Sequence, residues 1–292
     1  TLARPVPADG GGRILIDKTY QDAKSYRVEA GGEIVFDRSL GIKRDSVVLP
    51  AGYELAACNF PSQILQEQDG RVKISLWNAG PAEAPLLLRA RPSRGATAPP
   101  SPMTAALDER AHQSRDIVYE LGQPETHAFS LYHDYTETRA GMDRYVNVVR
   151  EGSTVRGPGG RDLDTGERLA PELLKGAAIT RAGVSEPDLV VTPTTEVVVF
   201  HYGAVPRGGS KRLRMNETYV DAERYKVVDG ELVWRRALGR AHNAIVLPAG
   251  WALSASTMPA VVTTQADGRV RLDFTNPRPD EIDTLIVAHR AR

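Results

Sequence analysis

The feature that most constrains the fold of this chain is a repeat, because one long segment occurs twice. Residues 45–78 and 243–276 align without a gap, and 13 of the 34 aligned positions are identical. The match continues upstream, where Thr19–Val28 pairs with Thr218–Val227. A repeat of this length predicts two copies of one folding unit, which we call the first copy and the second copy.

A difference of one residue separates the upstream match from the main match. It falls at Gly31–Gly32 in the first copy and at Asp229–Gly230 in the second. Both places are rich in turn-forming residues, so we expect a turn between two strands to absorb the extra residue.

Both copies show the alternation that is typical of a half-buried β-strand. Every second residue of Arg71–Trp77 is apolar, and Arg269–Thr275 repeats the pattern. The pairs Asp69–Gly70 and Asp267–Gly268 precede these segments and predict two-residue type I′ hairpins. Six or seven such strands in each copy predict an antiparallel β-sandwich. The residues expected to fill the cores are Leu49, Leu55, Val72, Ile74 and Leu76, with Leu247, Leu253, Val270, Leu272 and Phe274.

The predicted fold is therefore all-β, with two homologous antiparallel β-sandwich units joined by a β-rich insert. The expected domains are residues 1–92 for the first sandwich, 93–195 for a Pro-rich linker and the insert, and 196–292 for the second sandwich.

Beyond the linker, alternation and β-branched residues predict several strands in the insert and one at the start of the second sandwich. The expected strands of the insert are Asp116–Leu121, His127–Thr136 and Arg144–Val149, and a buried strand, Glu196–Phe200, is expected to open the second sandwich. The Gly-rich segment Gly152–Arg168 is predicted to be a long loop, and Pro171–Gly176 is predicted to be a short helical turn.

Composition excludes several classes of function. The 37 basic residues balance the 37 acidic ones, and aromatic residues make up 6% of the chain, so neither charge nor stacking favours a nucleic-acid partner. No apolar run is long enough to span a membrane. The single cysteine, Cys58, excludes an intrachain disulfide and is expected to be a small buried side chain rather than a reactive thiol.

The strongest candidate for chemistry is the run from His127 to Arg150. His133 together with Asp134, Glu137 and Asp143 forms the candidate catalytic set of a hydrolase, provided that a turn folds the carboxylates back. In a metal-dependent variant of this hypothesis, His133, Asp134 and Asp143 are the ligands. The alternative is a strand edge whose charged groups pair across a sheet, with no metal and no cofactor.

The other histidines are expected to have no catalytic role. His201 reads as a hydrogen-bonded structural histidine. His242 and His289 replace Arg44 and Arg91 of the first copy, which suggests drift at the surface.

Three aromatic residues are candidates for ligand binding. Trp77 has no aromatic counterpart in the second copy, and Tyr132 and Tyr135 lie in the histidine-containing strand. They would suit a carbohydrate-binding module.

Sequence motifs of serine hydrolases, nucleotide-binding proteins and zincins are absent from the chain. The general layout is similar to that of secreted bacterial β-modules. We therefore expect a non-enzymatic module, exported to the periplasm or the extracellular space, that builds a cell-envelope or extracellular assembly. Its expected partner is another protein or another copy of itself, bound through sheet edges. A hydrolase with its site around His133 and a carbohydrate-binding module are the alternatives.

Overall fold

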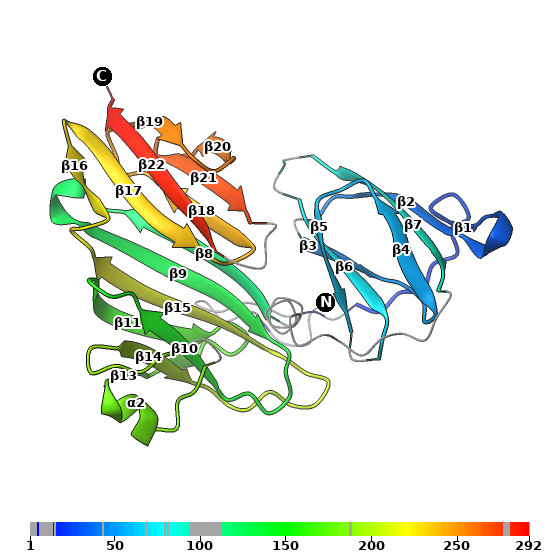
Figure 1. Ribbon diagram of the computed structural model, residues 1–292, viewed down its shortest axis with the longest axis horizontal. Coiled ribbons are helices and arrows are strands. Elements are labelled where there is room, and N and C mark those ends of the chain that lie inside the picture. The colour runs from blue at the N-terminus through cyan, green and yellow to red at the C-terminus, as the bar shows by residue number, and fades with distance from the viewer. Residues whose placement is uncertain are drawn as a thin grey trace. The chain divides into compact units, whose positions relative to one another are not determined.

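The computed structural model describes residues 5, 14, 16–42, 44–67, 69–78, 80, 82–93, 113–186, 189–276 and 281–291. Nearly all the regular structure in these residues is β-strand, in several sheets that are mostly antiparallel, so the protein is all-β as predicted. The chain divides into two compact units, residues 15–111 with 275–280, and residues 1–14, 112–274 and 281–292 (Figure 1). None of the described helices has the length and apolar character needed to cross a bilayer. The three domains expected from the sequence remain a prediction.

Two small antiparallel sheets make up the described part of the first copy. One has the strand order β1-β2-β7-β4 and the other β3-β6-β5. In chain order the strands are β1 (Tyr26–Val28), β2 (Ile34–Leu40), β3 (Arg44–Val48), β4 (Tyr53–Cys58), β5 (Ser62–Gln66), β6 (Val72–Trp77) and β7 (Ala84–Pro92). Apolar side chains from both sheets meet in one core, which includes Ile34, Leu49, Ile74 and Leu88.

The second copy has the same strand order. The order β16-β17-β22-β19 corresponds to β1-β2-β7-β4, and β18-β21-β20 corresponds to β3-β6-β5. The strands are β16 (Tyr225–Val228), β17 (Glu231–Leu238), β18 (His242–Val246), β19 (Trp251–Ser256), β20 (Val261–Thr264), β21 (Val270–Thr275) and β22 (Ile282–Arg290). Even an irregularity recurs: the pairing of β4 with β7 shifts between Leu55 and Ala57, and that of β19 with β22 between Leu253 and Ala255.

The two copies differ at one sheet edge. Strand β18 pairs in parallel with β8, from His242 opposite Asp116 to Val246 opposite Glu120. The sheet of the second copy thereby continues into an eight-stranded sheet of order β12-β11-β15-β9-β8-β18-β21-β20. Its further strands are β8 (Gln113–Leu121), β9 (Ala128–Glu137), β11 (Thr154–Asp162), β12 (Arg168–Leu169) and β15 (Lys211–Val220).

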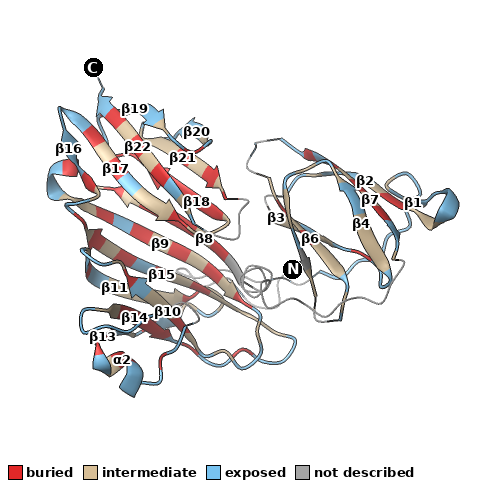
Figure 2. Ribbon diagram, viewed as in Figure 1, coloured by how far each residue is buried: buried red, intermediate tan, exposed pale blue. Residues whose placement is uncertain are grey.

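A separate three-stranded sheet, β10-β14-β13, consists of β10 (Arg144–Val149), β13 (Pro171–Lys175) and β14 (Glu196–His201). This sheet and the four-stranded sheet β16-β17-β22-β19 pack on one face of the eight-stranded sheet. Tyr145 of β10 contacts the ring of Tyr135, and Trp234 of β17 contacts the ring of Phe129, which lies on the same face of β9. The buried side chains form one continuous core, and buried residues alternate with less buried ones along β9 (Figure 2). The short helix α2 (Ala177–Arg181) covers the other face of the three-stranded sheet through Ile179.

The turns agree with the sequence in position but not always in type. The loop Ala30–Gly32 of the first copy has one residue more than the turn Asp229–Gly230, as the repeat predicted. Asp229 and Gly230 both have positive φ angles, which defines a type I′ turn.

The prediction of type I′ turns at Asp69–Gly70 and Asp267–Gly268 was wrong about the turn type. These pairs do lie at equivalent hairpin tips, but only the glycine of each has a positive φ angle. Gly70 donates to the Glu67 carbonyl and Gly268 to the Gln265 carbonyl, so each loop has three residues with the glycine in the bulge position.

The Gly-rich segment predicted as a loop is largely strand β11, which pairs with β15 and β12. The glycines serve two physical needs. The register on β15 shifts between Arg156 and Gly159, where a bulge interrupts the pairing. A Cβ atom at Gly160 would lie 3.1 Å from the Phe200 ring, so the chain approaches that ring too closely for a larger residue.

Three smaller predictions also need correction. Pro171–Gly176 contains strand β13 rather than a helical turn, and the helix begins afterwards, at Ala177. His127 lies before strand β9, with φ 54°, at the end of a 3-10 turn formed by Pro124–Thr126. Glu196–Phe200 is buried, as predicted, but pairs with β10 and β13 rather than with a strand of the second copy.

The predicted core residues lie inside. Six of them are buried, namely Leu49, Ile74, Leu76, Leu247, Leu272 and Phe274. The other four are partly buried and pack against the same cores, namely Leu55, Val72, Leu253 and Val270.

Candidate functional site

The candidate site lies on strand β9, whose alternation determines which side chains face the interior. Phe129, Leu131, His133, Tyr135 and Glu137 are buried against the two smaller sheets. His133 lies opposite Ile117 of β8 and Met215 of β15. Polar groups within an apolar face of this kind need partners or else carry a function.

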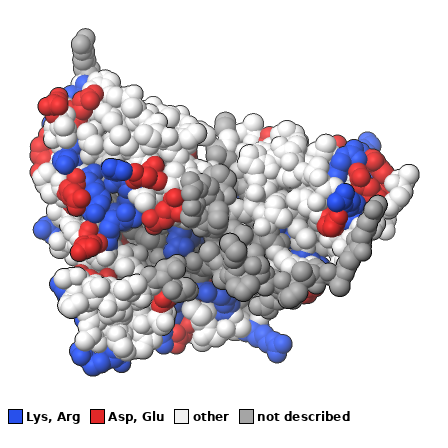
Figure 3. All heavy atoms as spheres, in the orientation of Figure 1, with Lys and Arg blue, Asp and Glu red and all other residues white. Residues whose placement is uncertain are grey.

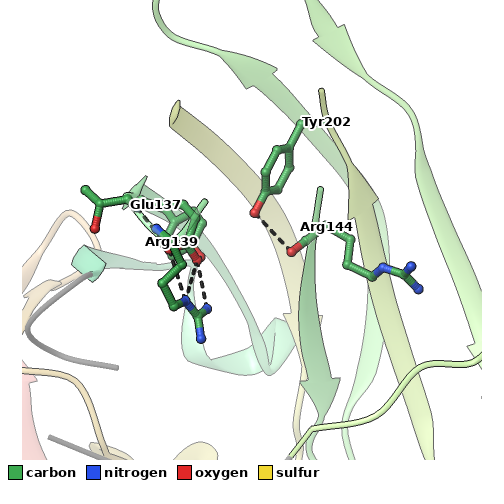
Figure 4. A network of polar contacts seen from close by, with 6 residues as sticks. Glu137, Arg139, Arg144 and Tyr202 are labelled. Carbon is green, nitrogen blue, oxygen red and sulfur yellow. Dashed lines mark hydrogen bonds and ion pairs between the residues drawn. The ribbon is translucent and has the colours of Figure 1, made fainter. Parts of the chain in front are cut away.

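Glu137 ends the buried row and is fully buried (Figure 4). Its carboxylate accepts hydrogen bonds from the backbone N–H groups of Thr138 and Arg139 at 2.9 and 2.8 Å, from the Arg139 guanidinium at 2.8 Å, and from the Tyr135 hydroxyl. Burial acts to raise the pKa of Glu137, but these hydrogen bonds outweigh it and hold the pKa below its ordinary value. A carboxylate with this many donors fixes the turn after β9 and has little basicity left for catalysis.

Tyr202 lies beyond this group. Its hydroxyl donates to the Arg144 carbonyl at 3.0 Å (Figure 4), and burial followed by the nearby Glu137 charge raises its pKa. Tyr202 therefore remains a neutral hydrogen-bond donor that ties the chain after β14 to the start of β10.

His133 is the buried imidazole of the candidate set. Its Nδ1 lies 3.5 Å from the Tyr145 hydroxyl, and its Nε2 is buried without a hydrogen-bond partner among the described residues. Burial, with the positive charges of Arg115, Arg240 and Arg236, lowers the pKa of His133 well below its usual value. The ring is therefore neutral at physiological pH.

Asp134 and Asp143 do not join His133. Asp134 is on the opposite face of β9, where the Arg214 guanidinium binds it with two contacts of 2.6 Å. Asp143 is exposed and pairs with Arg144 at 3.1 Å. The four candidate side chains therefore do not converge, and their catalytic and metal-binding roles stay predictions. Among the residues that the structure describes, no group of three or more His, Cys, Asp or Glu side chains is placed to hold a metal ion.

The three aromatic ligand candidates occupy different environments. Tyr135 is 2% exposed and part of the core. Tyr132 is on the opposite face of β9, with the Arg214 guanidinium 4.5 Å from its ring centre. Trp77, in the first copy, is partly buried under Arg44 at 4.8 Å. They do not share one binding face, and their role in ligand binding stays a prediction.

The expectation that His242 lies at the surface was wrong. His242 is 5% exposed, with Nε2 at 3.3 Å from Asp273 and Nδ1 at 3.6 Å from Asp116. Burial acts to lower its pKa, but the two carboxylates outweigh it and raise the pKa above the ordinary value. His242 thus lies between carboxylates of β8 and β21, the two strands that flank β18 in its sheet.

The remaining single candidates have structural contacts. His201 is exposed, with Nε2 3.3 Å from Glu172. His289 lies 2.9 Å from the Ser254 hydroxyl. The Cys58 sulfur, half-buried, lies 3.1 Å from the Phe60 carbonyl oxygen and 3.3 Å from the Ser62 hydroxyl.

Sequence reasoning missed a second buried acid, Glu217 of β15. One carboxylate oxygen accepts hydrogen bonds from Asn147 at 2.5 Å and Tyr219 at 2.8 Å, and the other is buried without a partner among the described residues. Burial raises the pKa of Glu217. The signal was present in the sequence: Glu217 lies in phase with Leu213, Met215 and Tyr219 on one strand face, and an acid in such a row is rarely buried without a reason.

Arg236 of β17 was missed as well. Its guanidinium lies among three aromatic rings, 5.3 Å from the centres of Tyr119 and Phe129 and 5.7 Å from that of Tyr219. Arg236 is also close enough to Glu217 to lower the pKa of that carboxyl.

Comparison with known proteins finds no family model and no curated protein that matches. Among solved structures, an M1 zinc metallopeptidase from Deinococcus radiodurans matches with a TM-score of 0.35 and 15% identity, over 59% of this chain and 40% of that one. An aminopeptidase N family protein from Idiomarina loihiensis matches with a TM-score of 0.36 and 10% identity, over 60% of this chain and 29% of that one. A putative protease from Parabacteroides distasonis matches with a TM-score of 0.32 and 12% identity, over 61% and 40%. The chain therefore spans about two fifths or less of the length of these structures.

Proposed function

We propose that this chain is a non-enzymatic β-sheet module that binds another protein by strand addition at β3. The observation that carries the proposal is the contrast between equivalent positions in the two copies. Ala244 and Val246 of β18 are buried, and they pack with Val118 of the neighbouring strand β8. The equivalent Ser46 and Val48 of β3 are exposed.

The backbone supports the same conclusion. Strand β3 ends the described order β3-β6-β5, whereas β18 continues into β8. An end strand has backbone N–H and C=O groups directed away from its sheet, and a partner strand satisfies them by β-augmentation. The pairing of β18 with β8 indicates the geometry expected for the partner of β3, which is a parallel strand in the register of β8.

A peptide with the sequence of residues 113–121 tests the proposal, because it is the strand that the equivalent edge accepts. We expect the labelled peptide to bind the full chain in fluorescence anisotropy. Lysines at Ser46 and Val48 should weaken binding at least tenfold, since charged residues block edge pairing. Ile64→Lys, on the other edge of the same sheet, is the matched control and should leave binding unchanged. Failure of the peptide to bind, or equal loss in the control, would overturn the proposal.

Light scattering on the same samples identifies the source of the partner strand. Concentration-dependent association that the Ser46→Lys/Val48→Lys variant abolishes would assign the partner as another copy of the chain. Export to the periplasm or the extracellular space, and a role in an envelope assembly, stay predictions from the sequence.

A hydrolase is the second candidate, and one observation favours it. His133 is held neutral and keeps Nε2 without a hydrogen-bond partner among the described residues, as a general base requires. Turnover of p-nitrophenyl acetate and of alanine p-nitroanilide, with and without added zinc, tests this candidate. His133→Asn should abolish any such turnover, while activity that survives in the variant would exclude His133 as the base.

A further inference from the structure

Arginine side chains gather between the sheet that contains β17 and the sheet that contains β10, where both cover the eight-stranded sheet. Arg236 comes from β17, Arg240 follows that strand, and Arg150 follows β10. Basic side chains form a group over the region of β17 and β9, with acidic side chains around it (Figure 3). We call Arg150, Arg236 and Arg240, with the buried His133 and Glu217 beneath them, the arginine seam.

The positive charges of Arg150 and Arg236 are only partly compensated. Arg150 lies 3.8 Å from Glu281 and 3.5 Å from the Ala237 carbonyl oxygen, which are long contacts for a guanidinium. Burial and then the nearby Arg236 lower the pKa of Arg150, so the two cations repel one another in a partly buried place. Arg236 makes no ion pair with any residue that the structure describes, whereas the adjacent Arg235 binds Asp283 at 2.5 Å.

Beneath the arginines, two buried polar atoms lack partners in the described part of the chain. They are Nε2 of His133, which is 5% exposed, and Oε1 of Glu217, which is 2% exposed. Both atoms lie within reach of the charge of Arg236, which acts on the pKa of His133 and on that of Glu217. Guanidinium groups are donors only, so their clustering favours a ligand that is rich in acceptors.

We propose that the arginine seam binds a small oxyanion, with the chemistry that carboxylates and phosphates share, and that Arg236 is its principal partner. A planar guanidinium binds two oxygens of such an anion at once. The aromatic rings of Tyr119, Phe129 and Tyr219 hold Arg236 in place, so little side-chain entropy remains to be lost when the anion binds.

The first copy provides the comparison. Arg38 is the repeat counterpart of Arg236, and it is exposed, 5.6 Å from the ring centre of Tyr20. The counterpart of Glu217 is Lys18, which is also exposed. The repeat therefore keeps the arginine, but only the second copy combines it with a buried acid and a buried histidine.

Isothermal titration of the full chain with succinate and with inorganic phosphate tests the proposal, at ionic strength held constant with sodium chloride. We expect saturable binding of at least one probe, and Arg236→Gln should weaken it at least tenfold. Arg38→Gln is the matched control and should bind as the unchanged chain does. The probe that binds distinguishes a carboxylate ligand from a phosphate ligand.

Folding of each variant is checked by far-UV circular dichroism. If Arg236→Gln does not fold, Arg150→Gln takes its place, because Arg150 lies at the edge of the core and is expected to weaken binding in the same way. No binding of either probe, or equal binding by wild type and a folded Arg236→Gln, would overturn the proposal. Neither outcome bears on the edge of β3, which belongs to the other compact unit.

Discussion

The two copies have the same strand order and differ in how deeply equivalent side chains are buried. Tyr225 and Trp234 of the second copy are 0% and 1% exposed. Their counterparts in the first copy are Tyr26, 46% exposed, and Phe36, partly buried. The strand pattern determines the pairing within a copy, but the neighbouring strands determine how much free energy a given side chain contributes.

The largest expected effect on stability comes from truncating Trp234 of the second copy, compared with truncating its counterpart Phe36 in the first copy. Trp234→Ala should lower the free energy of unfolding by about 3–5 kcal/mol, because it leaves a large cavity beside Tyr119 and Phe129. Phe36→Ala should cost roughly half as much, because Phe36 already contacts solvent. Calorimetry of each variant, with urea unfolding as a second measurement, checks the difference. Equal losses would mean that burial does not distinguish the two positions.

Truncating a core leucine should lower the free energy of unfolding by a similar amount in both copies, in contrast to the aromatic pair. Leu49 is 4% exposed and Leu247 is 0% exposed. Leu49→Ala and Leu247→Ala should each cost about 2–5 kcal/mol in the unfolding of their own unit. A loss below about 0.5 kcal/mol for either variant, the usual size of a surface effect, would contradict the assigned strand face.

Stability should depend on pH near neutrality only in the unit that contains the second copy, since the other unit, residues 15–111 with 275–280, includes no histidine. The pKa of His133 is depressed, so the unfolded chain takes up a proton below about pH 6.5 that the folded chain does not. This unit should lose about 1.4 kcal/mol per pH unit as the pH falls below that value. His133→Gln should remove this loss.

The pKa of His242 is raised, so its stabilising contribution is complete below about pH 6.5 and is lost as the pH rises through its folded-state pKa. His242→Arg, which restores the residue type of Arg44, should remove the loss of stability that His242 causes as the pH rises above about 6.5. Urea unfolding of the three proteins between pH 5.5 and 8 checks both signs. A flat profile for the unchanged chain would contradict both pKa shifts.

Much of the fold could be predicted from the sequence because strand alternation and turn residues act locally. The hairpin positions, the buried Glu196–Phe200 strand and the inner face of β9 all follow from a period of two residues. The strand β11 was missed because its glycines resemble a loop, and their cause, the close approach of Phe200, lies 40 residues away in the chain.

The candidate site was harder to predict because it depends on contacts between distant segments. The pKa of His133 is lowered first by burial and then by charged groups from β8 and from the region of β17, and none of these causes is visible in the local sequence. Adjacency in sequence suggested Asp134 as its partner, and strand geometry places that residue on the opposite face. Glu217 and Arg236 lie on different strands and are 19 residues apart in the chain, so no local motif joins them.

The smallest expected effect is at the turn where the copies differ in length, and it tests whether loop length changes local strain. Gly31 and Gly230 have φ angles of 82° and 83°, and neither has an atom within 4 Å of an added Cβ. Alanine at either position should therefore cost about 1 kcal/mol, because only the backbone conformation is penalised and no side chain has to move. Thermal unfolding of Gly31→Ala and Gly230→Ala measures the two losses. A penalty at Gly230 well above that at Gly31 would show that the two-residue turn tolerates less adjustment than the three-residue loop, and the two turns would then be equivalent in position but not in energy.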